Sequence, residues 1–127
     1  MQFETLRTVD SQDAPSLAPD DRPIDLVHLS RVTMGDRALE REVLQLFDRQ
    51  SSILIARMRT AAPAGIATLA HTLNGSARGI GAWRVARAAE MLELAGGSGE
   101  PTGEALEKLA AASDEACAVI ADLLRAN

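Results

Sequence analysis

The chain has 127 residues, of which 46% are hydrophobic, so it is long enough for one domain with a single core. Its net charge of −5 and its aromatic content of 2% argue against nucleic acid or an anionic membrane as a partner. No signal peptide opens the chain, no apolar run is long enough to cross a bilayer, and the single cysteine, Cys117, excludes an internal disulfide and a cysteine-based metal cluster. We therefore expect a cytoplasmic protein.

Alanine and leucine dominate the hydrophobic residues, which favours closely packed helices over sheets. Residues 1–22 mix Ser, Asp, Pro and Gln with few apolar residues, and this composition predicts a flexible N-terminal tail. The apolar residues of 23–127 recur at helical spacing in four long segments joined by short connections. We predict an all-α fold, an antiparallel up-down four-helix bundle with a short extra N-terminal helix.

The short helix is predicted over residues 23–33, because Pro23 and Asp25 are typical of a helix start and Gly35–Asp36 of a break. His28 lies in this helix, and nothing around it in the sequence suggests chemistry, so it is interpreted as a solvated surface residue. The buried side of the helix is expected to hold Leu26, Leu29 and either Val27 or Val32.

The second and third helices are predicted over residues 36–59 and 63–81. Pro63 is well placed as a first helical residue, and the glycines of Gly79–Gly81 suit a left-handed helix stop. The buried face of the second helix is expected to consist of apolar residues three and four positions apart: Leu39, Val43, Leu46, Phe47, Leu54 and Met58, with Ile53 at the margin.

The fourth helix is predicted over residues 83–95, with Trp83 as a partly buried anchor at its start and Val85, Ala88, Ala89 and Leu92 inside. The glycine-rich stretch 96–101 lacks the Lys-Ser/Thr ending of a phosphate-binding loop, so we interpret it as a plain flexible connector. Thr102 is a candidate cap for the last helix, with Glu104 favourable in its first turn. The apolar face of that helix comprises Leu106, Leu109, Ala116, Ile120 and Leu123.

His71 is the most informative residue of the third helix. On a helical projection of about 100° per residue it lies roughly 140° from the middle of the apolar stripe, and so it faces solvent. A histidine on a polar face is ordinarily just a solvated surface residue, but the neighbours of His71 are unusually small and uncharged. They are Ala64, Ala67, Thr68, Asn74 and Gly75, followed by Arg78.

Three features favour a functional role for His71. Gly75 costs the helix about 1 kcal/mol relative to alanine, which is explained if another molecule must approach there. Arg78 lies on the same stripe about 10 Å further along the axis, and its side chain leans back toward His71, where it can meet an anion. Ala82, at the turn, is 11 residues from both His71 and Glu93, so antiparallel packing brings Glu93 level with the imidazole. There the Glu93 carboxylate either orients the ring or is a solvated surface residue.

The stretch Ala70–Ala82, reading A-H-T-L-N-G-S-A-R-G-I-G-A, with the later Ala89–Glu93, resembles the histidine-containing phosphotransfer (HPt) domain. The resemblance implies a four-helix bundle in which His71 accepts a phosphoryl group on Nε2 and passes it to an aspartate of another protein. It also implies that Mg²⁺ and the aspartate come from a partner receiver domain, so that this chain binds no cofactor or metal of its own. One residue departs from the family pattern, since Asn74 stands where members usually carry a lysine that helps to neutralise the phosphoryl group.

The partners implied by the resemblance are receiver domains of a hybrid histidine kinase and of a response regulator, bound by a monomer. Besides the small residues around His71, exposed parts of the second helix are expected to widen the docking surface, namely Gln50, Ser51 and Ile53. Three other functions are weighed. The first is a degenerate family member that docks receivers without being phosphorylated. The second is the pair of dimerisation helices of a sensor kinase, which would carry a proline soon after the histidine. The third is a metal enzyme, which would need more ligands than two distant histidines.

Overall fold

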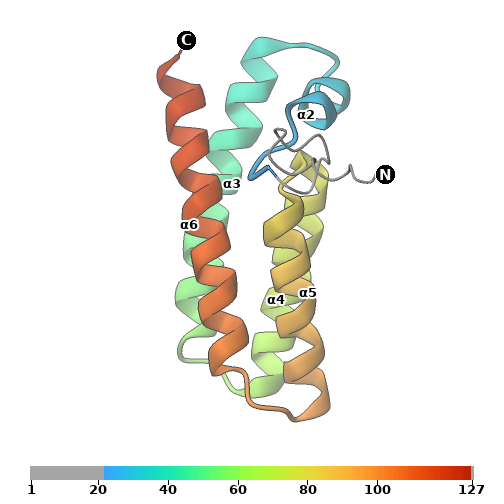
Figure 1. The fold of residues 1–127 in the computed structure, drawn as a ribbon, viewed down its shortest axis with the longest axis vertical. Helices are drawn as coiled ribbons and strands as arrows, with labels where there is room; N and C mark the ends of the chain where they lie inside the picture. The colour runs from blue at the N-terminus through green and yellow to red at the C-terminus, as the bar shows by residue number, and fades with distance from the viewer. Residues whose placement is uncertain (1–21, 127) are drawn as a thin grey trace, which may run out of the picture.

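The computed structural model describes residues 22–126, which form five α-helices and no strand (Figure 1). Four long helices run antiparallel, and the short α2 lies across the end of the bundle where α4 meets α5. The predicted all-α bundle with an extra N-terminal helix is confirmed. Apart from Arg22, the predicted tail of residues 1–22 lies outside the described residues. The helices are α2 (Leu26–Val32), α3 (Arg37–Met58), α4 (Pro63–Ile80), α5 (Trp83–Ser98) and α6 (Gly103–Arg125).

Most helix ends follow from residues that the sequence makes recognisable. The carboxylates of Asp25 and Asp36 cap α2 and α3 by accepting hydrogen bonds of 3.1 Å from backbone N–H groups three residues later. Pro63 begins α4 as its first residue. Gly81 ends α4 in the left-handed region with a φ of 83°, which lets the chain turn directly into α5.

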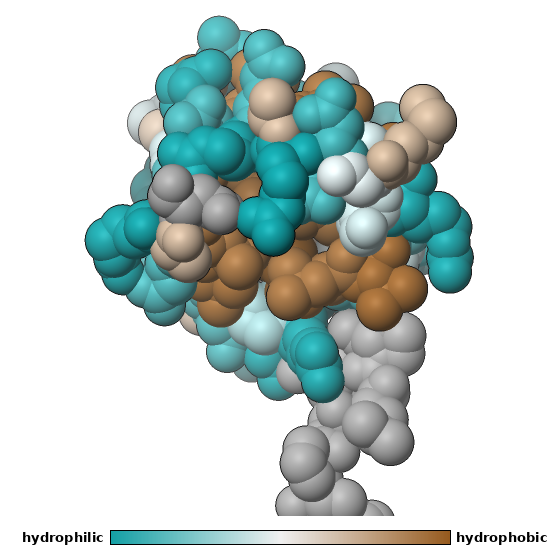
Figure 2. All heavy atoms as spheres, turned by 90° about the horizontal axis from the view of Figure 1, so that it is seen from above, coloured by the Kyte–Doolittle hydropathy of each residue, from teal (hydrophilic) through white to brown (hydrophobic). Residues whose placement is uncertain are grey.

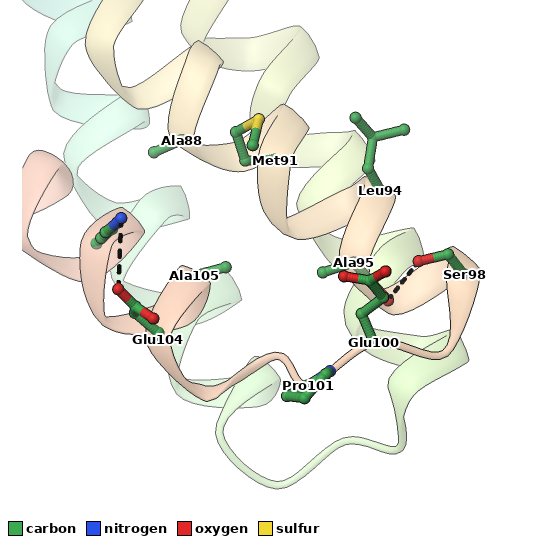
Figure 3. A pocket seen from close by; sticks show the side chains of 10 residues that line it. Ala88, Met91, Leu94, Ala95, Ser98, Glu100, Pro101, Glu104 and Ala105 are labelled. Carbon is green, nitrogen blue, oxygen red and sulfur yellow. Dashed lines mark hydrogen bonds and ion pairs between the residues drawn. The ribbon is translucent and has the colours of Figure 1, made fainter.

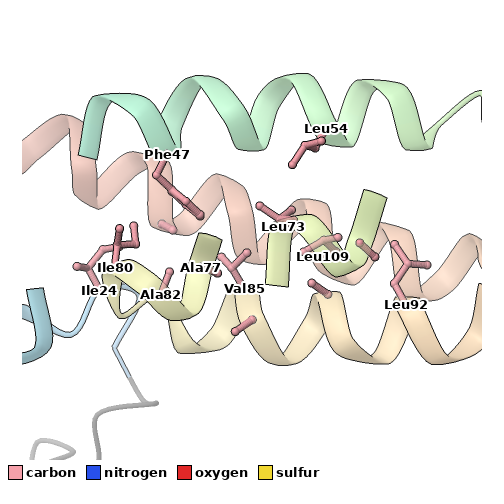
Figure 4. Packing of buried hydrophobic residues seen from close by; sticks show 14 of the residues in the cluster. Ile24, Phe47, Leu54, Leu73, Ala77, Ile80, Ala82, Val85, Leu92 and Leu109 are labelled. Atoms are coloured by element: carbon pink, nitrogen blue, oxygen red, sulfur yellow. The ribbon is translucent and has the colours of Figure 1, made fainter. Parts of the chain in front are cut away.

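The core lies between the four long helices and is built mainly from aliphatic side chains (Figure 4). Large residues such as Phe47 of α3, Leu109 of α6 and Leu92 of α5 point into it at different levels along the bundle. The facing sides of α4 and α5 carry small residues instead, among them Ala70, Ala77, Ala86 and Ala89. These small side chains allow the two helices to pack closely and so fix their register. Within residues 22–126, no helix has the length and apolar character that a membrane span requires.

The buried side of α2 is narrower than predicted. Only Leu29 of the helix is buried, and Ile24 just before it supplies the second anchor. A helix of seven residues rests on the bundle through a single turn, so its flanking apolar side chains stay exposed. Figure 2, seen from this end of the bundle, shows hydrophobic side chains among hydrophilic ones. The exposed apolar residues of α2 are Leu26, Val27 and Val32.

The buried face of α3 is also rotated from the predicted one. Leu39 and Leu46 are exposed, whereas Leu44, which was not expected inside, is buried. Two apolar stripes run along α3, and the core uses the one that includes Ser51. That residue is small enough to lie against α6. The buried stripe is Leu44, Phe47, Ser51, Leu54 and Met58.

Part of the predicted connector 96–101 is helical, because α5 continues to Ser98. Gly96 is buried against the start of α4, and a Cβ atom there would lie 2.8 Å from the carbonyl oxygen of Pro63. The glycine is therefore required by helix packing and not by chain flexibility. Thr102 does take the N-cap position of α6, but its side chain makes no capping hydrogen bond within the described residues.

Candidate functional site

His71 stands at the middle of α4 on the outer surface of the bundle. The opposite side of α4 buries Ala70, Leu73 and Ala77 completely, which holds the helix against the core. The side chain of His71 is 75% exposed, so most of it is open to solvent. The rigid part of the helix thus presents an accessible imidazole at a fixed position.

Glu93 of α5 contacts this imidazole, with 2.9 Å between its Oε2 and Nδ1 of His71. An ionised carboxylate only accepts hydrogen bonds, so Nδ1 carries the proton and donates. In the neutral ring, the exposed Nε2 then holds the lone pair. The antiparallel turn at Gly81 brings these residues together although they are 22 positions apart. The predicted proximity of Glu93 is therefore present in the structure.

Arg78 lies about two turns after His71 on α4 and contacts two other residues. Its Nε donates to Oδ1 of Asn74 over 2.9 Å, and its Nη2 donates to Oε1 of Glu90 over 3.3 Å. Arg78 thus leans back along α4, as expected, and reaches Asn74 instead of His71 itself. Glu90 was not singled out from the sequence, although it lies one turn before Glu93 on the same side of α5.

The surface of α4 next to His71 is open. A Cβ atom built on Gly75 or Gly79 would meet no atom within 4 Å among the residues compared in the described chain. Ala64 and Thr68, one to two turns before the histidine, are exposed as predicted. Ala67, which was predicted to be exposed beside His71, is half-buried because it packs against Gly96 of α5. The imidazole of His71 is therefore flanked on α4 by small side chains.

The contribution of α3 is smaller than predicted. Ile53 is 54% exposed, while Gln50 is half-buried beside a small cavity of about 210 Å³ between α3 and α4. The prediction that Ser51 helps to form a docking surface is wrong. Ser51 is fully buried, and its hydroxyl donates to the carbonyl of Asp48 and lies 3.6 Å from the thiol of Cys117. Burial also raises the pKa of that thiol.

A cavity lies away from the histidine, between α5 and α6 (Figure 3). It has a volume of about 460 Å³, and Met91 and Leu94 border it, but His71 does not. No group of three or more His, Cys, Asp or Glu side chains within residues 22–126 is arranged to hold a metal ion. The exposed imidazole, with small exposed side chains beside it on α4, can be reached by a macromolecule as well as by a small ligand.

His28, which was interpreted as a solvated surface residue, instead makes structural contacts. Nε2 of His28 lies 3.2 Å from the carbonyl oxygen of Gly79, and its ring packs edge-on against Trp83 at 4.9 Å. Trp83 begins α5 and is half-buried, as predicted, and its indole N–H donates to Asp25 over 2.9 Å. That hydrogen bond lowers the pKa of Asp25. His28 thus helps to fasten α2 to the bundle.

Comparison with known proteins adds one finding to this geometry. A family model described as "Hpt domain" matches residues 42–126, which is more than half of the chain. The match includes most of α3 and all of α4, α5 and α6, and so it contains both His71 and Glu93. No curated protein and no solved structure matches the chain.

Proposed function

The chain belongs to the Hpt domain family, and from this premise we propose that it carries a phosphoryl group on His71 and shuttles it between receiver-domain aspartates in a multistep phosphorelay. The family makes the chain a phosphocarrier module and not a catalyst in its own right. The observation that carries the proposal is the exposed imidazole of His71, whose Nδ1 contacts the carboxylate of Glu93.

The transfer step follows from that contact. The lone pair of Nε2 attacks the phosphorus of an aspartyl phosphate, a P–N bond forms, the P–O bond to the aspartate breaks, and the aspartate leaves as a carboxylate. Nδ1 keeps its proton throughout, so the phosphorylated ring carries a positive charge next to Glu93. The reverse sequence returns the phosphoryl group to a second aspartate.

The remaining parts of the reaction are assigned to the partner. In-line transfer requires charge neutralisation and positioning, and we propose that Mg²⁺ and the acceptor aspartate are supplied by the receiver domain. This chain would bind no cofactor of its own. Its own contribution near the phosphoryl group is the amide of Asn74, the guanidinium of Arg78 and the open surface at Gly75.

The proposed docking surface is the outer side of α4 with the adjoining edges of α5 and α3. Small side chains let a receiver approach His71 closely, and the proposed surface includes Ala64, Ala67, Thr68, Gln50 and Ile53. The partners would be the receiver domain of a hybrid histidine kinase and that of a response regulator, each bound transiently by one copy of this chain.

A second candidate function rests on Asn74. Because an asparagine stands where the family usually has a lysine, phospho-His71 lacks one neighbouring cation. A chain that docks receivers without accepting phosphate would tolerate this loss. Such a docking module would regulate signalling by occupying the receiver.

The two functions are separated by replacing the histidine. We expect the parent protein, incubated with a phosphorylated receiver domain, to gain acid-labile phosphate, and His71→Gln to gain none. His28→Gln is the matched control, since it alters the other histidine but leaves the proposed acceptor intact, and it should be labelled like the parent. Receiver binding by His71→Gln should persist, because the docking surface is unchanged. Labelling of His71→Gln, or an unlabelled parent that still binds receivers, would contradict the carrier function.

A further inference from the structure

The guanidinium of Arg78 is shared between two helices. Nε is bound to Asn74 on its own helix, and Nη2 to Glu90 on α5. Arginine only donates hydrogen bonds, so the amide of Asn74 must turn its oxygen toward Arg78. The amide N–H groups of Asn74 then point away from Arg78 and remain available as donors.

The two contacts of Arg78 differ in strength. The bond to Asn74 spans 2.9 Å and joins residues one turn apart, a spacing that keeps the guanidinium on the His71 side of α4. The ion pair with Glu90 is longer, at 3.3 Å, and both of its side chains are about half exposed. Exposed ion pairs of this kind contribute little and exchange readily with solvent. The weaker of the two contacts is therefore the one that can open.

A phosphoryl group on His71 would change the balance of charge around Arg78. Without it, the carboxylates of Glu90 and Glu93 are the anions next to this guanidinium and the imidazole. With it, a dianionic group stands within about two helical turns of Arg78, and an arginine–phosphoryl contact is stronger than an exposed arginine–carboxylate pair. Glu90 then competes with the phosphoryl group for the same cation.

We propose that Glu90 is a positioning residue that holds Arg78 in reserve, and that Arg78 leaves Glu90 for the phosphoryl group once His71 is phosphorylated. The inference rests on the proposed function and deepens it. In this arrangement Asn74 and Arg78 together replace the usual lysine, and the competition from Glu90 limits how long phospho-His71 survives. Glu90 thereby tunes the lifetime of the phosphorylated carrier without touching the reacting atoms.

The test uses a small donor, phosphoramidate, so that no partner protein enters the measurement. Its phosphoryl group passes to Nε2 as the P–N bond to ammonia breaks. The half-life of phospho-His71 is then followed by ³¹P NMR in the parent, Glu90→Gln, Arg78→Gln and the double variant. We expect Glu90→Gln to lengthen the half-life by about two- to fivefold, in keeping with an exposed ion pair, and Arg78→Gln to shorten it by a similar factor.

The double variant decides between competition and simple charge. If Glu90 acts through Arg78, the double variant decays like Arg78→Gln alone. If Glu90→Gln lengthens the half-life equally in both backgrounds, or has no effect, the proposal is overturned. Glu115→Gln is the matched control, because it breaks the exposed pair of Arg84 and Glu115 between α5 and α6 and should leave the half-life unchanged. A parent that takes no phosphate at all would instead refute the proposed function, and this inference with it.

Discussion

The inner and outer sides of the α4–α5 hairpin use glycine for opposite reasons. On the inner side, Gly96 lies so close to α4 that a Cβ atom would be 2.8 Å from the carbonyl oxygen of Pro63, and at the other end a Cβ atom on Gly81 would be 3.0 Å from the carbonyl oxygen of Asp25. On the outer side, a Cβ on Gly75 or Gly79 would meet no atom within 4 Å among the residues compared in the described chain. The inner glycines are needed by this chain's own packing, whereas the outer ones leave space for another molecule.

This difference explains how glycines can lie near His71 while the imidazole keeps a defined position. The close contact of Gly96 with α4 sets the distance between α4 and α5 at that end, and the register of the two helices places Glu93 at Nδ1 of His71. The outer surface then adds nothing that would block the ring. Substitutions on the two sides of the hairpin should therefore have opposite consequences, with stability lost on one side and docking lost on the other.

The largest expected effect is on the inner side, at Gly96. Gly96→Ala should lower the free energy of unfolding by about 1–3 kcal/mol, because the added methyl group meets backbone atoms of α4 that cannot move independently. Its neighbour Gly97 is the matched control, since a Cβ there meets nothing within 4 Å among the described residues compared. Gly97→Ala should stabilise the protein by about 0.5–1 kcal/mol through helix propensity. Urea unfolding measures both changes, and equal values would show that the hairpin is not closely packed at this end.

The next effect is on the outer side, at Gly75. Gly75→Leu should leave the fold intact or slightly more stable, since the side chain projects into open space and leucine favours helix. We expect phosphoryl transfer from a receiver domain to slow by about tenfold, the equivalent of about 1.4 kcal/mol at the docking surface. Gly75→Ala, a smaller change, should retain most of the transfer rate.

A donor of different size provides the control for Gly75. Phosphoramidate is small enough to reach Nε2 past a leucine, so its labelling of His71 should be unaffected by Gly75→Leu. Equal loss with both donors would mean that the substitution disturbs the imidazole and not the approach of the partner. An unchanged rate with the receiver would place the docking surface elsewhere.

The sequence was sufficient for the parts of the site that depend on helix geometry alone. The position of His71 opposite the core stripe follows from the helical period, and the pairing with Glu93 follows from equal distances to the turn at Ala82. Ser51 was misplaced because α3 carries two apolar stripes, and only the packing of α6 against it determines which one is buried. The contact of Glu90 with Arg78 depends on the conformations of two long exposed side chains, which no periodicity specifies.

The prediction that residues 96–101 form a connector was partly wrong for a related reason. Gly96 stands in a run of small residues that is typical of a loop, and its role becomes visible only when the backbone of α4 is known to lie against it. A glycine at close backbone contact and a glycine in a flexible loop are identical in one sequence. The neighbour in space distinguishes them, and that neighbour, Pro63, is 33 residues away.

The smallest effect is expected where the inner side closes against α2. Trp83→Phe removes the indole N–H that Asp25 accepts, and should lower the free energy of unfolding by about 1 kcal/mol at pH 7. The hydrogen bond from Trp83 lowers the pKa of Asp25 from its ordinary value of 3.8, so its contribution is fully present above that value and is lost as the pH falls through the lower pKa of the folded state. The stabilities of the parent and the variant should therefore begin to converge as the pH falls below about 3.8, and should meet once the pH is below the lowered pKa of Asp25.

Asp25→Asn supplies the comparison for this pH dependence. The amide oxygen can still accept from Trp83, but it carries no charge that titrates, so the stability difference between Asp25→Asn and Asp25→Asn/Trp83→Phe should stay constant between pH 3 and pH 7 as far as this pair is concerned. Stability curves from urea unfolding across that range distinguish the two cases. If the parent and Trp83→Phe stay equally far apart at every pH, Trp83 fastens α2 through ring packing with His28, and the charge of Asp25 plays no part in closing this end of the hairpin.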